Sequence, residues 1–256
     1  VVLLLAAVWA FADIPSFEEL ENPDSKLATQ VISSDGEVLT TFHIENRSFV
    51  SYEELSPNIV NAAVATEDER FYRHSGIDFE SLARVLVKTV LSSDSSQGGG
   101  STITQQLAKT LYPRENMGGS PFKMVWTKLK EWVTAVKLER SYTKDEIMNM
   151  YMNQVFFGSN AYGIKAAAQT FFSKSPSDLT VDEAATLVGM VNKPTRYNPA
   201  LNPDKSLVRR NFVISQMEKA GFITKAERDS IQQIPITLSY QVQDHNAGFG
   251  PYFSKR

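Results

Sequence analysis

Apolar residues recur every three to four positions over most of this chain, and that spacing restricts it to a largely helical fold. Ser56 precedes a proline, which places a capping hydroxyl before the residue that best opens a helix. Thr-x-x-Glu occurs at 143–146, 180–183 and 224–227, where the two side chains can satisfy unpaired backbone N–H groups. Asn202-Pro203 opens a further helix that Gly221 closes. We therefore expect a mainly α body over residues 51–235.

A small β-hairpin is expected before this body. The segments 28–32 and 37–43 flank Ser-Asp-Gly at 34–36, where glycine readily takes positive φ. Residues 13–50 are thus predicted to be a connector that contains the hairpin. At the other end, Ile236 to Val242 has the composition of a strand, and residues 236–256 are predicted to start a linker.

The first twelve residues are uninterruptedly apolar. As a helix they would span about 18 Å, less than the roughly 30 Å of a bilayer core. We expect residues 1–12 to be the outer end of a truncated transmembrane helix, and a clipped signal peptide is the alternative. Both interpretations place the remainder outside the cytoplasm.

Composition excludes several classes of protein. The net charge of −3 and the isoelectric point near 5.7 argue against a nucleic-acid partner, which would require a strong basic excess. The chain has no cysteine, so disulfides, thiolate catalysis and zinc–thiolate sites are ruled out.

The helix after Pro57 carries the first candidate for chemistry. Ile59, Ala63, Glu67 and Phe71 are four residues apart, so a carboxylate continues an apolar stripe. Burial there would raise the pKa of Glu67 toward the range useful for proton transfer. The alternative is a helix-end glutamate neutralised by a nearby arginine. His74, seven residues on, is expected to be a buried hydrogen-bonding residue.

The segment 98–113, GGGSTITQQLAKTLYP, combines a glycine-rich loop with a helix start. Ile103, Leu107 and Leu111 are predicted to be its buried stripe, and Thr102, Gln105, Gln106 and Lys109 to point away from the core. Free N–H groups, hydroxyls and a lysine at a helix start suit a diphosphate. The alternative is a capped surface helix behind a flexible loop.

Two later segments are less specific. In 113–141 we expect Val125, Leu129, Trp132 and Val136 to form a buried stripe, with Lys128 and Glu131 on its flank. Such a pair is usually solvated, although the Met, Phe and Trp content also suits an element that dips into a membrane interface. In the helix after Lys144, Asn153 and the aromatic residues are expected to be structural, and Gly158 to permit a turn.

These segments together resemble the family-51 glycosyltransferase domain, the peptidoglycan glycosyltransferase of bifunctional class A penicillin-binding proteins. The resemblance covers roughly residues 20 to 255. Its motifs are EDxxFxxHxG at 67–76, GxSTITQQLxKN at 99–110, Lys-x-x-Glu at 128–131, a fourth at 151–158 and an NPxxxxxRRN-like run at 202–211.

The resemblance implies a lysozyme-like, two-lobed, mainly α fold, with a membrane-facing jaw at roughly residues 92–135. It also implies that lipid II is polymerised into a growing glycan strand, with inversion at the MurNAc anomeric carbon and release of undecaprenyl diphosphate. Glu67 would take the proton of the acceptor hydroxyl, and Glu131 would assist or orient basic groups. The substrate-binding residues implied are Asp68, Ser101, Thr102, Gln105, Gln106, Lys109, Lys128 and Asn153.

The resemblance leaves open a divalent cation, Mg²⁺ or Mn²⁺, with unknown ligands, and implies no organic cofactor. It implies a single-pass protein of the bacterial inner membrane, with the catalytic domain on the periplasmic face. The final GPYFSKR resembles the approach to a C-terminal transpeptidase domain.

Three positions depart from the motifs: Thr110 replaces Asn, Thr127 replaces Arg, and Asn149 stands where Glu is frequent. Loss of that Arg leaves Lys109, Lys128 and Lys130 to compensate the diphosphate charge. Two rival functions stay open: a lysozyme-like hydrolase or lytic transglycosylase, and a non-catalytic, membrane-tethered glycan-binding module. The second motif argues against a hydrolase, which has no need of a diphosphate cradle.

Overall fold

The computed structural model describes residues 29–32, 38–42, 46–47, 49–84, 100–111 and 121–241. The predicted membrane segment at 1–12, the Ser-Asp-Gly turn and most of the glycine-rich loop lie outside these residues. Across the ranges that are described, no helix is both long and apolar enough to cross a bilayer.

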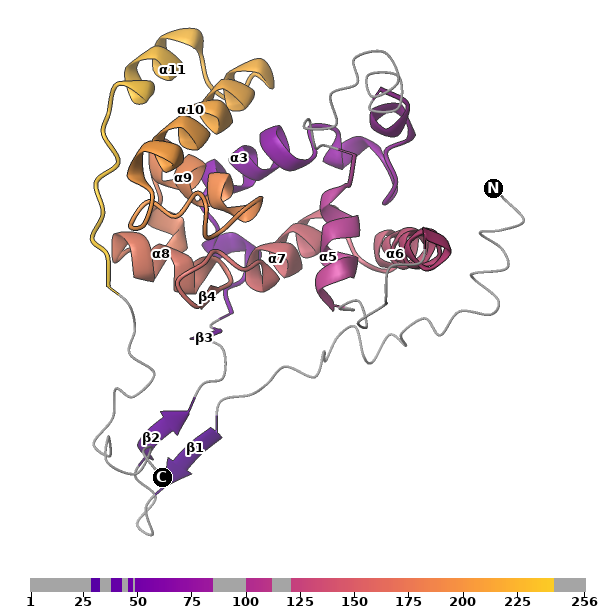
Figure 1. Ribbon diagram of the computed structural model, residues 1–256, viewed down its shortest axis with the longest axis horizontal. Helices are drawn as coiled ribbons and strands as arrows, with labels where there is room; N and C mark the ends of the chain where they lie inside the picture. The colour runs from indigo at the N-terminus through magenta and orange to yellow at the C-terminus, as the bar shows by residue number, and fades with distance from the viewer. Residues whose placement is uncertain are drawn as a thin grey trace.

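The prediction of a mainly α body is confirmed (Figure 1). The labelled strands and α-helices are β1 (Thr29–Ile32), β2 (Val38–Phe42), β3 (Asn46–Arg47), α3 (Pro57–Glu67), α5 (Ile103–Leu111), α6 (Pro121–Ser141), α7 (Lys144–Gln154), β4 (Ala161–Tyr162), α8 (Ile164–Phe172), α9 (Val181–Val191), α10 (Pro203–Lys219) and α11 (Lys225–Gln232). Short 3-10 helices cover Tyr52–Glu54, Phe71–Arg73 and Pro176–Asp178.

The predicted hairpin is present as the antiparallel pair β1 and β2, with an irregular register between Val31 and Ile32. A second pair was not predicted: β3 runs parallel to β4, joining residues 46–47 to residues 161–162. Strands of two residues are too short to show an alternating pattern, so only the folded chain reveals them.

The helix-start signals act as the sequence predicts. Complete capping boxes open α7, α9 and α11, and the Ser56 side chain accepts a hydrogen bond from the Asn58 amide at the start of α3. At the end of α10, Gly221 has a φ of +79°. The amides of Gly221 and Phe222 donate to the carbonyls of Glu218 and Met217, as expected for a glycine-terminated helix.

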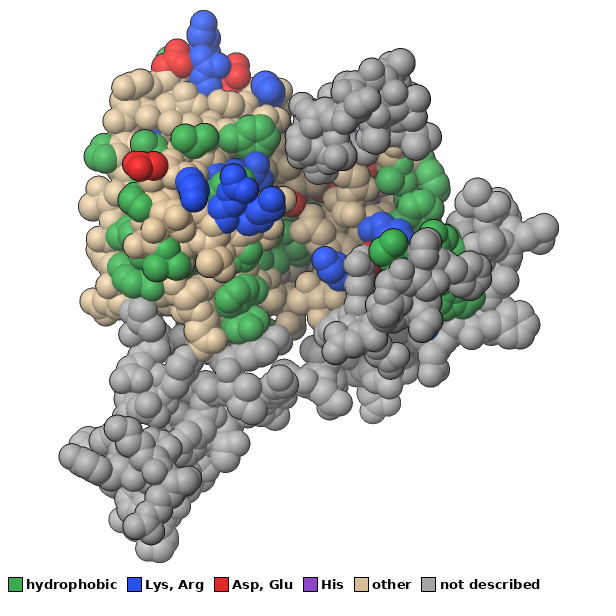
Figure 2. Space-filling view, in the orientation of Figure 1, with side chains coloured by type: hydrophobic (Ala, Val, Ile, Leu, Met, Phe, Trp, Pro, Cys, Tyr) green, Lys and Arg blue, Asp and Glu red, His purple; other side chains and the backbone are tan. Residues whose placement is uncertain are grey.

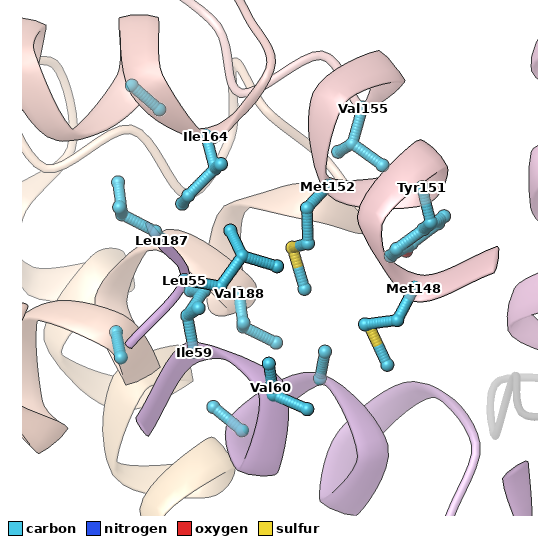
Figure 3. Packing of buried hydrophobic residues seen from close by; sticks show 14 of the residues in the cluster. Leu55, Ile59, Val60, Met148, Tyr151, Met152, Val155, Ile164, Leu187 and Val188 are labelled. Carbon is cyan, nitrogen blue, oxygen red and sulfur yellow. The ribbon is translucent and has the colours of Figure 1, made fainter. Parts of the chain in front are cut away.

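The core surrounds α3, which is buried on nearly all sides because it carries almost only small and branched apolar residues. Ile59 and Val60 of α3 meet Met152 of α7 and Val188 of α9 (Figure 3). On its other side α3 packs against α10. The helix that carries Glu67 is therefore held in place by tertiary contacts, and not by intrinsic helix propensity alone.

A second group of helices lies beside this core, with α5 packed against both α6 and α7 (Figure 1). The loop that follows the 3-10 helix Phe71–Arg73 passes so close to α6 that a Cβ on Gly76 would lie 2.9 Å from the Ala135 carbonyl carbon and oxygen. Because Gly76 also has a φ of +89°, only glycine suits this position. The helix α6 continues beyond residue 135, the expected limit of the jaw, to Ser141.

The expected buried stripe of α6 is wrong. Val125 is 59% exposed, and Leu129, Trp132 and Val136 are only partly buried. The buried face is instead centred on Glu131, Ala135 and Leu138. The reason is tertiary packing: α6 packs against α5, and the loop at Gly76 lies against Ala135 on this face, so the face that carries Glu131 is buried.

The strand expected from residue 236 is absent over residues 236–241, which run extended along α8. The amides of Ser239 and Gln241 donate to the carbonyls of Phe171 and Thr170 at 3.0 and 2.8 Å. Carbonyls at a helix C-terminus have no partner inside the helix, so they take these donors and no second strand is needed.

Candidate active site

Glu67 is the last residue of α3. The expected stripe is correct for Ile59 and Ala63, which are both buried, but Phe71 is not part of the same helix. The chain leaves the helix at Asp68 and Phe71 begins a short 3-10 helix, although the Phe71 ring is still fully buried. Glu67 is therefore held at a helix end whose carbonyl dipoles disfavour negative charge.

The pKa of Glu67 is raised above the ordinary glutamate value of 4.5. Burial is the largest cause and the neighbouring Asp68 charge adds to it, whereas a hydrogen bond from Gln106 and the charge of Arg209 act in the opposite direction. The Gln106 Nε2 atom donates to Glu67 Oε2 at 3.0 Å. A carboxyl group in this setting can accept and release a proton nearer to neutral pH than a solvated one.

Asp68 links this helix end to the start of α5. Its carboxylate contacts His74 Nε2 at 2.9 Å and accepts from the Ile103 amide at 3.0 Å. The Gly76 amide donates to His74 Nδ1, so Nε2 carries the proton and donates to Asp68. His74 is thus the buried hydrogen-bonding residue that its segment predicts.

The expectation that Thr102 and Gln105 point away from the core is wrong, since they are 3% and 1% exposed. Thr102 Oγ1 donates to the Gly76 carbonyl at 2.7 Å and accepts from the Gln105 amide, and Gln105 Nε2 also donates to that carbonyl. The loop at Gly76 covers this side of α5, which a local pattern does not show. With Asp68 bound to the Ile103 amide, two N–H groups of the expected diphosphate cradle already have partners.

Lys128 Nζ and Glu131 Oε2 form an ion pair at 2.9 Å, in which the glutamate is buried and the lysine is partly exposed. Glu131 is 7% exposed, whereas the Lys128 side chain is 35% exposed. Lys128 Nζ also contacts Ser101 Oγ at 3.1 Å. Glu131 therefore orients the lysine so that its charge lies beside the residues that precede α5.

An open pocket joins the end of α3 to the residues that precede α5. In Figure 2 a hollow separates the larger body from the smaller part, and acidic and basic side chains are visible along it. The pocket is lined by Ala65, Thr66, Glu67, Asp68, Glu69, Asp78, Ser81, Arg84, Gly100, Ser101, Thr102 and Gln216. The carboxyl group at the end of α3 and the residues before α5 thus line the same pocket.

Asp68, Ser101 and Thr102 are the predicted substrate-binding residues that line this pocket; the other five, Gln105, Gln106, Lys109, Lys128 and Asn153, are not among the lining residues. Lys109 is exposed on α5, one turn beyond Gln106 on the same face. Asn153 is 5% exposed, and its amide exchanges hydrogen bonds with the backbone of Val50 at 2.9 and 3.0 Å. Its Nδ2 group also donates to Asn149, so the structure gives Asn153 a structural position and no contact with the pocket.

The structure adds residues that the motifs did not single out as site residues, and four of them have side chains suited to binding or to orienting Glu67. Arg84 and Gln216 line the pocket, and Arg209 lies close enough to act on Glu67. Tyr151, expected to be a core aromatic, donates from its hydroxyl to Gln106 Oε1 at 3.2 Å. For Arg209 the sequence offered one signal, its place in the RRN-like run at 202–211. That run does not show that Arg209 lies near Glu67.

The described residues do not form a ready metal site. No three His, Asp or Glu side chains among them converge on one point. Asp68 is bound to His74 and the Ile103 amide, and Asp78 is held by Arg70, which keeps the pKa of its carboxyl well below the usual range despite burial. These residues do not fit a divalent cation held by the protein alone.

The sequence profile of the transglycosylase family matches residues 35–218. The chain belongs to the transglycosylase family. This is the family that the five motifs indicate, the peptidoglycan glycosyltransferase domain of class A penicillin-binding proteins. The matched residues include Glu67, α5, the Lys128–Glu131 pair and most of α10.

Relatives of this transglycosylase domain are penicillin-binding proteins. Penicillin-binding protein 1A of Aquifex aeolicus (strain VF5) is 35% identical over 98% of the chain, and penicillin-binding protein 1F of Bacillus subtilis (strain 168) is 36% identical over 88%. The chain spans about a third of these relatives, 33% and 30% of their lengths. A crystal structure of penicillin-binding protein 1A from Haemophilus influenzae aligns over 84% of this chain and 21% of its own, with a TM-score of 0.47 and 23% identity.

Proposed function

We propose that this chain polymerises lipid II into glycan strands, with inversion at the MurNAc anomeric carbon and release of undecaprenyl diphosphate. The proposal refines the peptidoglycan glycosyltransferase activity that membership of the family indicates. The observation that carries it is the shared pocket, which the partly buried carboxyl group of Glu67 lines together with Ser101, whose hydroxyl contacts the paired Lys128.

Glu67 would act as the general base. The acceptor 4-hydroxyl oxygen attacks the donor anomeric carbon, its proton passes to Glu67, and the bond from that carbon to the diphosphate oxygen breaks. The hydrogen bond from Gln106 holds one carboxylate oxygen at 3.0 Å, which leaves the other to receive the proton. Attack on the face opposite the leaving group accounts for the inverted anomer.

Lys128, with Ser101 beside it, would stabilise the charge that develops on the departing diphosphate. A cation and a hydroxyl held in place before the reaction need no rearrangement as the charge forms. Glu131 fixes the lysine but also neutralises part of its charge. Arg84 lines the pocket together with Ser101, and it would supply positive charge in place of the arginine that Thr127 replaces.

The membrane and the transpeptidase remain part of this proposal. The apolar residues 1–12 would tether the domain to the outer face of the inner membrane, and exposed Met124 and Val125 at the start of α6 would face the lipid. The greater length of the penicillin-binding relatives is consistent with a further C-terminal domain. A need for Mg²⁺ or Mn²⁺ stays a prediction for a metal titration.

Incubation with lipid II separates the proposed function from its rivals. Long glycan strands are expected as the product. Shortening of preformed glycan would identify a hydrolase or lytic transglycosylase, and an unchanged lipid II pool with retained glycan binding would identify a binding module. A lysozyme-like hydrolase also uses a cleft glutamate, so the carboxyl group alone does not discriminate between these functions.

The rate of polymerisation should rise with pH through an acid limb that lies above the ordinary glutamate pKa of 4.5. Burial raises the pKa of Glu67, and only the deprotonated form can accept the acceptor proton. The measurement is kcat/KM for lipid II between pH 4.5 and 8.5, with thermal stability recorded in parallel. A rate that is already at its plateau at pH 4.5 would contradict this assignment.

A further inference from the structure

The hydroxyl of Tyr151 lies at the end of a short hydrogen-bond chain that reaches Glu67. It donates to Gln106 Oε1 at 3.2 Å, and Gln106 Nε2 donates to Glu67 Oε2 at 3.0 Å. The three residues come from α7, α5 and α3, so these hydrogen bonds join both groups of helices. Tyr151 is 2% exposed and therefore has little access to water.

The groups at the two ends, Glu67 and Tyr151, decide which atoms of the Gln106 amide donate and accept. An ionised carboxylate can only accept, so the amide must present its nitrogen to Glu67. Within the described part of the structure the tyrosine hydroxyl has no other acceptor than Gln106 Oε1. If the amide turned round, the buried hydroxyl would lose its acceptor and the carboxylate would face a carbonyl oxygen. Both losses oppose rotation of the amide.

We infer that Tyr151 is a positioning residue, whose buried hydroxyl fixes the Gln106 amide so that Glu67 keeps one oxygen bound and presents the other to the acceptor. For its kinetic consequences this inference rests on the proposed function. For its structural content it rests only on the described contacts.

Two further observations support the inference. Burial, followed by the charges of Glu67 and Asp68, raises the pKa of Tyr151 well above 10, so the phenol stays protonated and remains a donor. Glu67 Oε1 has no hydrogen-bond partner among the described residues, and Glu67 lines the pocket. Glu67 Oε1 is thus available to accept from a hydroxyl group in the pocket.

Tyr151→Phe removes the hydroxyl and keeps the ring. We expect kcat to fall about fivefold to tenfold, the loss of one hydrogen bond of about 1 kcal/mol, with KM changed by less than about twofold. The acid limb should move up by about half to one pH unit, because the amide no longer favours the ionised carboxylate. A lower melting temperature with an unchanged pH profile would show a structural role and overturn the inference.

The matched control is Tyr240→Phe. It also removes one hydrogen-bonded hydroxyl, at 2.9 Å from Ser159 Oγ, on the extended segment over α8. Its pH profile should equal that of the wild type. A shift as large as that of Tyr151→Phe would show that the effect is general and would overturn the inference.

A double variant tests whether Tyr151 acts through Gln106. If it does, adding Tyr151→Phe to Gln106→Met should cause less than about twofold further loss of kcat, because the chain is already broken. Independent, multiplying losses would overturn the inference, since Tyr151 would then act by another route.

A direct titration separates failure of this inference from failure of the proposed function. The carboxyl carbon of Glu67 is followed by NMR without substrate, and its signal is assigned by its absence from Glu67→Gln. The midpoint in Tyr151→Phe should lie above that of the wild type by about half to one pH unit. An equal midpoint overturns the inference, whatever the protein does with lipid II. A wild type that does not polymerise lipid II overturns the proposed function alone.

Discussion

Glu67→Gln should stop glycan polymerisation while the fold stays intact. Glutamine keeps the shape of the side chain and an oxygen that can accept from Gln106 Nε2, but it cannot take a proton from the acceptor. General base catalysis contributes about 10² to 10⁴-fold, so the rate should fall by at least about a hundredfold. The measurement is the initial rate of lipid II polymerisation, with circular dichroism to verify the fold.

The melting temperature of Glu67→Gln should equal or exceed that of the wild type near pH 7. The pKa of Glu67 is raised by burial, so the folded protein binds this proton more tightly than the unfolded chain. The stability from that proton is fully present below the unfolded value of 4.5, and it is lost as the pH rises through the folded pKa. Glutamine removes this loss because it carries no charge at any of these pH values.

Glu69→Gln is the matched control for this variant. Glu69 lines the same pocket two residues away, but its side chain is exposed. Its activity should stay within about twofold of the wild type, because an exposed neutralised charge outside the proton path changes little. Normal turnover by Glu67→Gln, or equal losses in both variants, would refute the role of Glu67 as base.

Lys128→Met should give the second large loss, about 10² to 10³-fold in kcat. Loss of one fixed electrostatic donor at a developing charge typically costs this much. Methionine preserves the apolar stem of the lysine along α6 but removes the charge beside Ser101. The measurement is the single-turnover rate with saturating lipid II, which separates the chemical step from binding.

The buried Glu131 complicates the stability of this variant, since it would lose the partner that compensates its charge. Lys128→Met combined with Glu131→Gln should therefore recover much of the lost melting temperature but none of the activity. Lys137→Met, nine residues on and on the opposite face of the same helix, is the control and should lose less than about threefold. Recovery of activity in the double variant would show that Lys128 serves only to neutralise Glu131.

Local sequence signals were sufficient for most of the helices. Capping boxes, a Pro at a helix start and a Gly after a helix end act within one turn, so their partners are fixed by short spacing. The same holds for the placement of Glu67 at the end of an apolar helix. The hairpin, the helical body and the family could therefore be predicted from the sequence.

The expectations about exposure fail where one element covers another. Thr102 and Gln105 were expected to face outward, yet the loop at Gly76 covers them. The sequence favours a solvated Glu131, yet it is buried on a face of α6 that other elements cover. Asn153 stays a predicted substrate-binding residue, and its hydrogen bond to Val50 across 103 residues is a contact that no local pattern specifies.

The sequence by itself determined the helical fold, the family and the chemical types of the residues that meet in the pocket. It did so because helix periodicity, capping and motif spacing depend on residues within a few turns of one another. Only the tertiary structure decided which atoms meet: the Ile103 amide bonds to Asp68 across 35 residues, and the Tyr151 hydroxyl bonds to Gln106 across 45. Such contacts depend on how whole helices pack, and no local pattern specifies the packing of two distant helices.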